Sequence, residues 1–198
     1  MSTSTSTAVA AHKSTPTKVK SGRRGLLWRV RLSALYHLKR ERFLDGVDKS
    51  SKFVSAIGGA AAFAQFKESP ELGMWITGLI AITSTLSLVY GFSAKARKHA
   101  ELARDFKRLE AEITAAGEPL TAAQISSFDA KFLLIESGEP ATLGALVTAC
   151  HNELARAEGS DEHITPLHWF ESIFKNWIDF DQSKDHSSDK KICKFFCK

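Results

Sequence analysis

Cysteine is scarce in this chain of 198 residues, which holds Cys150, Cys193 and Cys197. An odd number of cysteines without a Cys-x-x-Cys spacing argues against a disulfide framework and against a zinc site. We therefore expect reduced thiols and no bound metal ion.

The sequence also lacks the common catalytic and nucleotide-binding motifs. It contains no Gly-x-Gly-x-x-Gly, no Gly-x-x-x-x-Gly-Lys-[Ser/Thr], no His-Glu-x-x-His and no Gly-x-Ser-x-Gly. The group closest to a catalytic arrangement is Cys150 beside His151, with Glu153 two residues further on. Adjacent residues on a helix point about 100° apart, so this pair makes a poor nucleophile–base dyad. We expect neither an enzyme nor a bound cofactor.

Charged side chains are missing from two stretches, residues 53–66 (FVSAIGGAAAFAQF) and 74–92 (MWITGLIAITSTLSLVYGF), which seven residues separate. About 20 residues, at ~1.5 Å each, cross a hydrocarbon core of ~30 Å. The second stretch has 19 residues and meets this length. The first has 14 and spans only if Lys52 and Lys67 snorkel at its ends or the bilayer thins locally.

Strand-like alternation with a period of two residues is absent as well, so we predict an all-α membrane protein. Its transmembrane helical hairpin occupies residues 50–94, with the two helices at about 52–67 and 73–92. The alternative is that both apolar stretches form core helices of a soluble protein.

Positive charge is concentrated outside the predicted hairpin. Residues 1–52 hold 12 Lys or Arg against three acidic residues, a net charge of +9, whereas the loop KESPELG has one lysine and two glutamates. Basic residues also open the segment after the second stretch. The positive-inside rule then places both termini in the cytoplasm. Nucleic-acid binding is the competing interpretation of this charge, but an adjacent apolar stretch favours anionic lipid headgroups as the partner.

The rest of the chain divides by composition. Residues 1–22 are rich in Ser and Thr and poor in large apolar groups, so we predict a disordered leader. Residues 23–49 predict a basic amphipathic helix on the inner leaflet or beside the bundle, with an ordinary soluble helix as the alternative. Residues 95–180 predict a cytoplasmic helical region, and residues 181–198 predict a flexible basic tail.

Helix signals divide the cytoplasmic region further. The second membrane helix is expected to continue without a break as far as Gly117. Thr121 is the expected N-cap of a helix over about 121–136, and another follows over about 141–157. An apolar stripe runs along the expected continuation of the second membrane helix, before Gly117. It consists of residues at helical spacing: Leu102, Phe106, Leu109 and Ile113.

Small and hydroxyl-bearing residues recur at four-residue spacing in both apolar stretches. Such spacing allows helix backbones to approach closely in lipid, within one hairpin or between chains. The hydroxyl groups are candidates for lining a water path, although Ser and Thr in a membrane helix commonly bond their own backbone carbonyls. The candidates for helix packing or pore lining are Ser55, Gly58, Gly59, Ala62, Thr77, Ala81, Ser84 and Thr85.

Aromatic residues cluster near the end of the helical region, in LHWFESIFKNWIDF. Tryptophan and phenylalanine at this density suit a membrane interface or a docking surface, with packing in the helical core as the alternative. The candidates for contact with a partner are Trp169, Phe170, Phe174 and Trp177.

The order of these elements resembles a known bacterial family. A basic helix containing Arg-Glu-Arg precedes the hairpin, and GFSAKARKHAELARDFKRLEAEI, IESGEPATLGALVTACHNEL and a Pro-Leu-His segment follow it. Over roughly residues 26–180 the chain is similar to the SLATT superfamily of two-transmembrane effectors, found beside nucleotide-second-messenger synthases or SLOG sensors in bacterial conflict systems. The short first stretch, the leader and the Cys-Lys-Phe-Phe-Cys tail depart from the family pattern.

This resemblance implies a membrane-perturbing, pore-forming effector of the bacterial inner membrane, oligomeric and triggered by a sensor or nucleotide-synthase partner. A second hypothesis is a membrane-anchored interaction module, in which the hairpin is a tether and the aromatic residues bind a protein. A third is a soluble helical protein that binds nucleic acid, for which the sequence offers least support.

Overall fold

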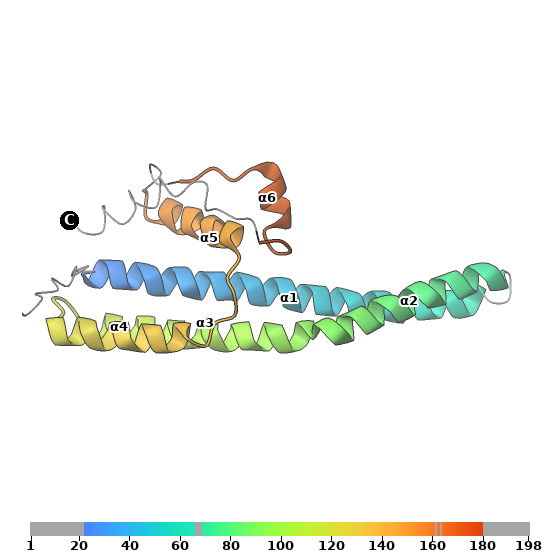
Figure 1. The fold of residues 1–198 in the computed structure, drawn as a ribbon, viewed down its shortest axis with the longest axis horizontal. Coiled ribbons are helices and arrows are strands. Elements are labelled where there is room, and N and C mark those ends of the chain that lie inside the picture. The colour runs from blue at the N-terminus through green and yellow to red at the C-terminus, as the bar shows by residue number, and fades with distance from the viewer. Residues whose placement is uncertain (1–21, 66–68, 161, 163, 180–198) are drawn as a thin grey trace, which may run out of the picture.

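The computed structural model describes residues 22–65, 69–160, 162 and 164–179, which form helices and connecting segments with no strand among them (Figure 1). The predicted all-α class is thus confirmed for the described residues. The predicted flexible tail and all but the last residue of the predicted leader lie outside them. The helices are α1 Arg23–Gln65, α2 Pro70–Tyr90, α3 Phe92–Ala115, α4 Ala122–Glu136, α5 Gly144–Ala157 and α6 Trp169–Phe174.

Helix α1 is a single helix of 43 residues, about 65 Å long at ~1.5 Å per residue. The sequence suggested an amphipathic helix over 23–49 followed by a separate membrane helix, and the structure joins the two. No proline interrupts α1. Ion pairs between residues four apart support the charged stretch where a break was expected: Asp45 with Lys49, and Asp48 with Lys52.

Helices α2 and α3 run in the same general direction (Figure 1), and Gly91 lies between the end of α2 and the start of α3. Gly91 adopts the left-handed conformation, with φ of 59° and ψ of 43°, and its N–H donates to the Ser87 carbonyl at 3.2 Å. Glycine enters this region without the steric cost that a Cβ atom imposes. The predicted uninterrupted helix from the second apolar stretch to Gly117 is therefore wrong at this residue.

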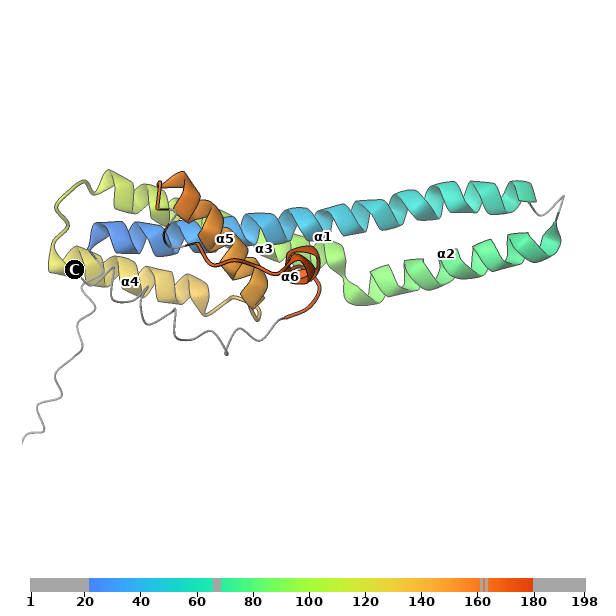
Figure 2. The ribbon, with the colours of Figure 1, turned by 90° about the horizontal axis from the view of Figure 1, so that it is seen from above.

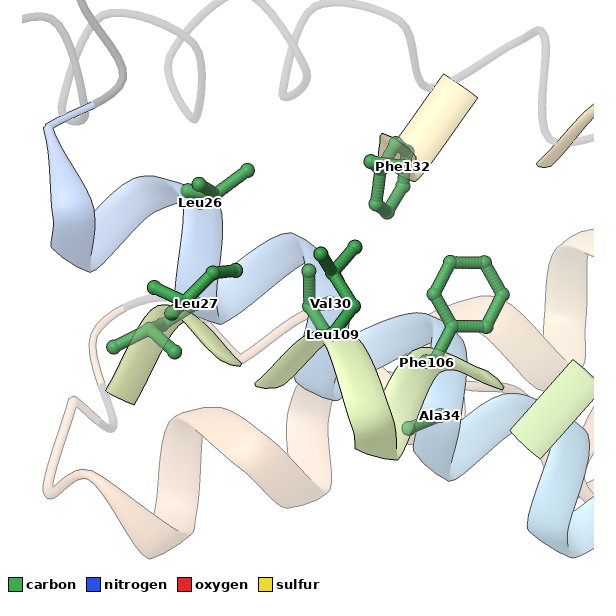
Figure 3. Close-up of a cluster of buried hydrophobic side chains, with 8 residues drawn as sticks. Leu26, Leu27, Val30, Ala34, Phe106, Leu109 and Phe132 are labelled. Atoms are coloured by element: carbon green, nitrogen blue, oxygen red, sulfur yellow. The ribbon is translucent and has the colours of Figure 1, made fainter. Parts of the chain in front are cut away.

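The first core lies where the N-terminal half of α1 packs against α3 and α4 (Figure 3). Its centre is Phe106, which is fully buried and contacts the Phe132 ring at a centroid distance of 5.4 Å. Burying a large apolar side chain stabilises a fold by ~1.5–3 kcal/mol. The stripe predicted for α3 is buried as expected, and the cluster comprises Leu26, Leu27, Val30, Ala34, Phe106, Leu109, Ile113 and Phe132.

Local signals locate α4 well and α5 less well. Thr121 caps α4 as predicted, because its side chain accepts from the Gln124 N–H and the Gln124 side chain accepts from the Thr121 N–H. Helix α5 begins at Gly144, three residues later than expected, and packs on α1 through Tyr36, Leu146 and Cys150. Burial raises the pKa of the Cys150 thiol to about 11, so this cysteine stays protonated at neutral pH.

Candidate functional site

The C-terminal part of α1 and the antiparallel α2 form a hairpin that extends beyond the other helices (Figures 1 and 2). Large apolar side chains on this hairpin are at least half exposed, and they belong to Phe53, Val54, Ile57, Phe63, Leu72, Met74, Trp75, Leu79, Ile82, Leu86, Leu88, Val89 and Tyr90. Contiguous apolar surface of this extent is rare on a soluble monomer.

The two helices of the hairpin differ in composition and in apolar length. The helical segment Pro70–Ala115, which α2 opens, is the one segment among the described residues that is long and apolar enough to cross a membrane. Only 6% of its most apolar 18 residues is buried, unlike the core helix of a soluble protein. The α1 stretch beside α2 does not meet the same criterion, because its described charge-free part, residues 53–65, is shorter than 18 residues and Asp48, Lys49 and Lys52 precede it.

The two helices contact each other through small residues. The hydroxyls of Ser55 and Ser84 lie 2.9 Å apart and form a hydrogen bond between α1 and α2. A Cβ atom added at Gly58 would lie 2.8 Å from the Ile80 Cδ1 atom, and Ala62 is 4% exposed. Close approach of two helix backbones requires small residues at such positions. Four of the predicted packing residues, Ser55, Gly58, Ala62 and Ser84, thus lie between the helices of one hairpin.

The other four predicted packing residues lie outside this contact. A Cβ atom added at Gly59 would meet nothing within 4 Å, and Thr77, Ala81 and Thr85 are exposed. The Thr77 and Thr85 hydroxyls donate to the carbonyls four residues earlier, at 2.9 Å and 2.8 Å. Both hydroxyl donors are therefore satisfied within α2. Thr77, Ala81 and Thr85, spaced four residues apart, form an exposed stripe of small residues on α2, whereas Gly59 lies on α1.

Introducing Ser55→Cys and Ser84→Cys together, in a chain without its native cysteines, should give a disulfide on mild oxidation in membranes. A disulfide joins residues whose Cβ atoms are ~3.8 Å apart. The native Oγ atoms of Ser55 and Ser84 are already 2.9 Å apart, so the two positions are close enough for a disulfide. Adding Gly58→Leu should slow cross-linking about fivefold or more, because overpacking costs ~1–3 kcal/mol. Gly59→Leu is the matched control, and equal slowing by both leucines would contradict this packing.

Two recesses flank the junction between the hairpin and the bundle, which is formed by the N-terminal half of α1 with α3, α4 and α5. One is a groove of about 880 Å³ whose lining includes Arg42, Phe43, Tyr90, Phe92 and Trp177. The other has about 560 Å³ and is lined by the polar residues Asp48, Ser51, Lys52, Ser55, Ser84, Ser87, Ser93 and Arg97, with four less polar neighbours. The two recesses share Ser51, Ser87 and Phe92. The first is lined mainly by apolar and aromatic surface, and the second, the hydroxyl-rich recess, is lined mostly by polar residues.

The predicted aromatic contact residues lie in and after the short helix α6. Trp169 is 75% exposed and Trp177 is 58% exposed, while the Trp177 ring packs edge-on against Phe43 at 5.1 Å. Phe174 is half-buried and packs against Phe170 at 4.6 Å. These exposures fit an interface better than burial in the helical core.

A buried polar cluster that the sequence did not predict lies between α1, α3 and the α4–α5 connection. His37 and His99 are 0% and 5% exposed, and their Nδ1 atoms are 2.8 Å apart. One ring must donate and the other accept, so the two tautomers are complementary. His37 Nε2 lies 3.1 Å from Glu139 Oε1 without completing an aligned hydrogen bond, and the His37 ring stacks on Phe106.

A sequence signal for this cluster existed. His99 precedes Phe106 by seven residues, on the same apolar stripe of α3, so a buried position could have been inferred. Its hydrogen-bond partner, His37 on α1, could not be inferred from the sequence. Burial, and then the neighbouring His37 and Arg40, lower the pKa of His99 to about 4. The imidazole is therefore neutral at pH 7.

Tyr36 connects this cluster to the start of α5. Its hydroxyl accepts a hydrogen bond from the Leu143 N–H at 3.1 Å, and burial raises its pKa. Together with the His37–Glu139 contact, this bond holds the α4–α5 connection on α1. The cluster stabilises the bundle and has no opening to a substrate-sized cavity among the recesses described above.

No protein-family model, curated protein or solved structure matches this chain. Among the described residues, no group of three or more His, Cys, Asp or Glu side chains is arranged to hold a metal ion. The exposed apolar hairpin and its junction with the bundle are therefore the candidate functional site.

Proposed function

We propose that this chain is a membrane-embedded effector that forms an oligomeric pore in a bacterial conflict or defence system. The observation that carries the membrane part of the proposal is the hairpin, where thirteen large apolar side chains are at least half exposed, whereas the bundle has a buried apolar core around Phe106. No other part of the described chain covers these hairpin side chains, and a lipid bilayer would do so.

Both helices of the hairpin cross the membrane in this proposal. Helix α2 has 21 residues, about 32 Å at ~1.5 Å per residue, which matches a hydrocarbon core of ~30 Å. The shorter apolar part of α1 reaches the far interface because it packs antiparallel on α2 and its Lys52 can snorkel. The bundle and both termini then lie in the cytoplasm of a multi-pass inner-membrane protein, as the basic flanks favour.

The pore would require several copies of the chain. The exposed stripe of Thr77, Ala81 and Thr85 on α2, and the open position of Gly59 on α1, are available for packing between hairpins. The hydroxyl-rich recess at the junction supplies polar groups where a water path would open toward the cytoplasm. A trigger that shifts α1 against α2 would break the Ser55–Ser84 hydrogen bond and turn those hydroxyls toward such a path.

The likeness to the SLATT superfamily supports the effector role and a sensor or nucleotide-synthase protein as trigger. The exposed Trp169 and Trp177 favour a second candidate, a membrane-anchored interaction module whose hairpin is a tether. In that case the membrane stays sealed, and Trp169 contributes to partner binding.

Induced expression in bacteria with a potential-sensitive dye, with fractionation of the same cells, tests the proposal. We expect the protein in the membrane fraction and depolarisation soon after induction together with the triggering partner. Membrane residence with an intact potential, even beside that partner, would favour the tether. Recovery in the soluble fraction without detergent would refute membrane insertion.

A further inference from the structure

The groove at the junction between hairpin and bundle combines three kinds of side chain. Helix α1 contributes Arg42, Phe43 and Val47, the end of α2 contributes Tyr90, and Trp177 closes one side. Its volume, about 880 Å³, falls within the ~300–1,000 Å³ of typical small-molecule sites. The pore proposed above does not use this groove.

The groove continues the apolar surface of the hairpin. Val54 and Leu86 belong to its lining, and each is more than half exposed on the hairpin. Tyr90, the last residue of α2, lies one helical turn beyond Leu86, at the end of the apolar segment that meets the bundle. Tyrosine and tryptophan concentrate where the hydrocarbon core meets the headgroups. The groove therefore extends from the acyl region toward the headgroup level of the cytoplasmic leaflet.

The charge of the groove is positive. Among the described residues, Arg42 is the one charged residue in the lining of this groove, and no carboxylate lies within ion-pairing distance of its guanidinium. The acidic residues of the following turns are neutralised, since Asp45 pairs with Lys49 at 2.7 Å and Asp48 with Lys52 at 2.6 Å. An arginine fork without a carboxylate partner is well suited to a phosphate group.

We propose that this groove binds one anionic phospholipid of the cytoplasmic leaflet. The phosphate contacts Arg42, and an acyl chain lies along Val47, Val54 and Leu86 between Tyr90 and Trp177. This site rests on the membrane insertion proposed above. Charge complementarity and continuity with the apolar hairpin select a lipid over a second copy of this chain or a free anion.

Quenching of tryptophan fluorescence by brominated lipids separates the lipid site from membrane insertion. One variant, Trp75→Phe with Trp169→Phe, reports on Trp177 at the groove. A second, Trp169→Phe with Trp177→Phe, reports on Trp75 within α2. Both retain Trp28, which is 8% exposed in the bundle and gives a constant background. Each is reconstituted in equimolar phosphatidylglycerol and phosphatidylcholine, with bromine on the acyl chains of one lipid at a time.

We expect both lipids to quench Trp75 equally, whereas phosphatidylglycerol should associate with Trp177 about fivefold more strongly than phosphatidylcholine. One basic side chain near an anionic surface contributes ~1 kcal/mol, which corresponds to this factor. Arg42→Gln should abolish the preference. Arg24→Gln is the matched control, because it removes the same charge from an exposed position ~27 Å away along α1.

Results that contradict the lipid site can be distinguished from results that contradict membrane insertion. Equal quenching of Trp177 by the two lipids, or a preference that Arg24→Gln removes as fully as Arg42→Gln, would overturn the lipid site while Trp75 still reports insertion. Loss of the preference on adding inorganic phosphate at constant ionic strength would assign Arg42 to small anions instead. Absence of quenching at Trp75 with either lipid would overturn membrane insertion and the lipid site together.

Discussion

Replacing Leu79 with lysine should remove most of the protein from the membrane fraction and abolish any depolarisation that its expression causes. Leu79 lies near the middle of α2 and is 64% exposed. In water, a lysine at such an exposed position would cost little. At the centre of a membrane helix it costs ~2.5–3.5 kcal/mol, enough to lower the inserted population about 100-fold.

The matched control is Leu134→Lys. Leu134 is 75% exposed on α4, so the two leucines are equally open and differ chiefly in whether lipid covers them. We expect Leu134→Lys to leave fractionation and depolarisation unchanged. Quantitative blotting of the membrane and soluble fractions measures both variants, and equal behaviour of the two would argue against a lipid environment for α2.

Sequence patterns predicted those parts of the fold that depend on one helix at a time. The apolar stripe of α3 is buried as its spacing indicated, since a helix places residues three and four apart on one face. Thr121 caps α4 because its hydroxyl satisfies an N–H that would otherwise lack a partner. The apolar character of α2 also follows from composition alone.

The parts that the sequence did not reveal depend on two helices at once. Gly58 and Gly59 are equivalent in composition, and only the position of Ile80 shows that the first is confined and the second is open. The continuity of α1 was missed because a change from charged to apolar residues resembles a boundary. The hydrogen bond between His37 and His99 joins residues that are 62 positions apart.

The long helix α1 links the two halves of the molecule mechanically. Its N-terminal half packs in the bundle core and carries His37, while its C-terminal part carries Ser55 and Gly58 against α2. A continuous helix transmits a displacement along its axis better than a hinged one. A change in the packing of α1 within the bundle should therefore change the geometry of the junction, where both recesses lie.

Acidification should weaken the bundle before its carboxylates titrate. The His99 pKa is lowered by burial to about 4, below its value of ~6.5 in an unfolded chain. Between these values the unfolded state binds a proton that the folded state excludes, so stability falls as pH decreases. Glu110 acts in the same direction at lower pH. Burial raises its pKa, but bonds from Lys107 and Arg31 outweigh this effect, and the net shift is downward.

The free energy of unfolding of the detergent-solubilised protein should accordingly decrease by ~2 kcal/mol between pH 6.5 and pH 5 through His99 alone. Denaturant titrations at both pH values measure this loss, followed by fluorescence of the buried Trp28 in a protein whose other three tryptophans are replaced by phenylalanine. His99→Gln keeps a hydrogen-bonding group beside His37 but cannot be protonated, so it should remove most of the decrease. His168→Gln, at an exposed histidine, should leave it intact. The His99→Gln change alters the buried imidazole pair, whereas His168→Gln does not. An undiminished pH dependence in His99→Gln would therefore show that groups other than His99 cause the loss of stability.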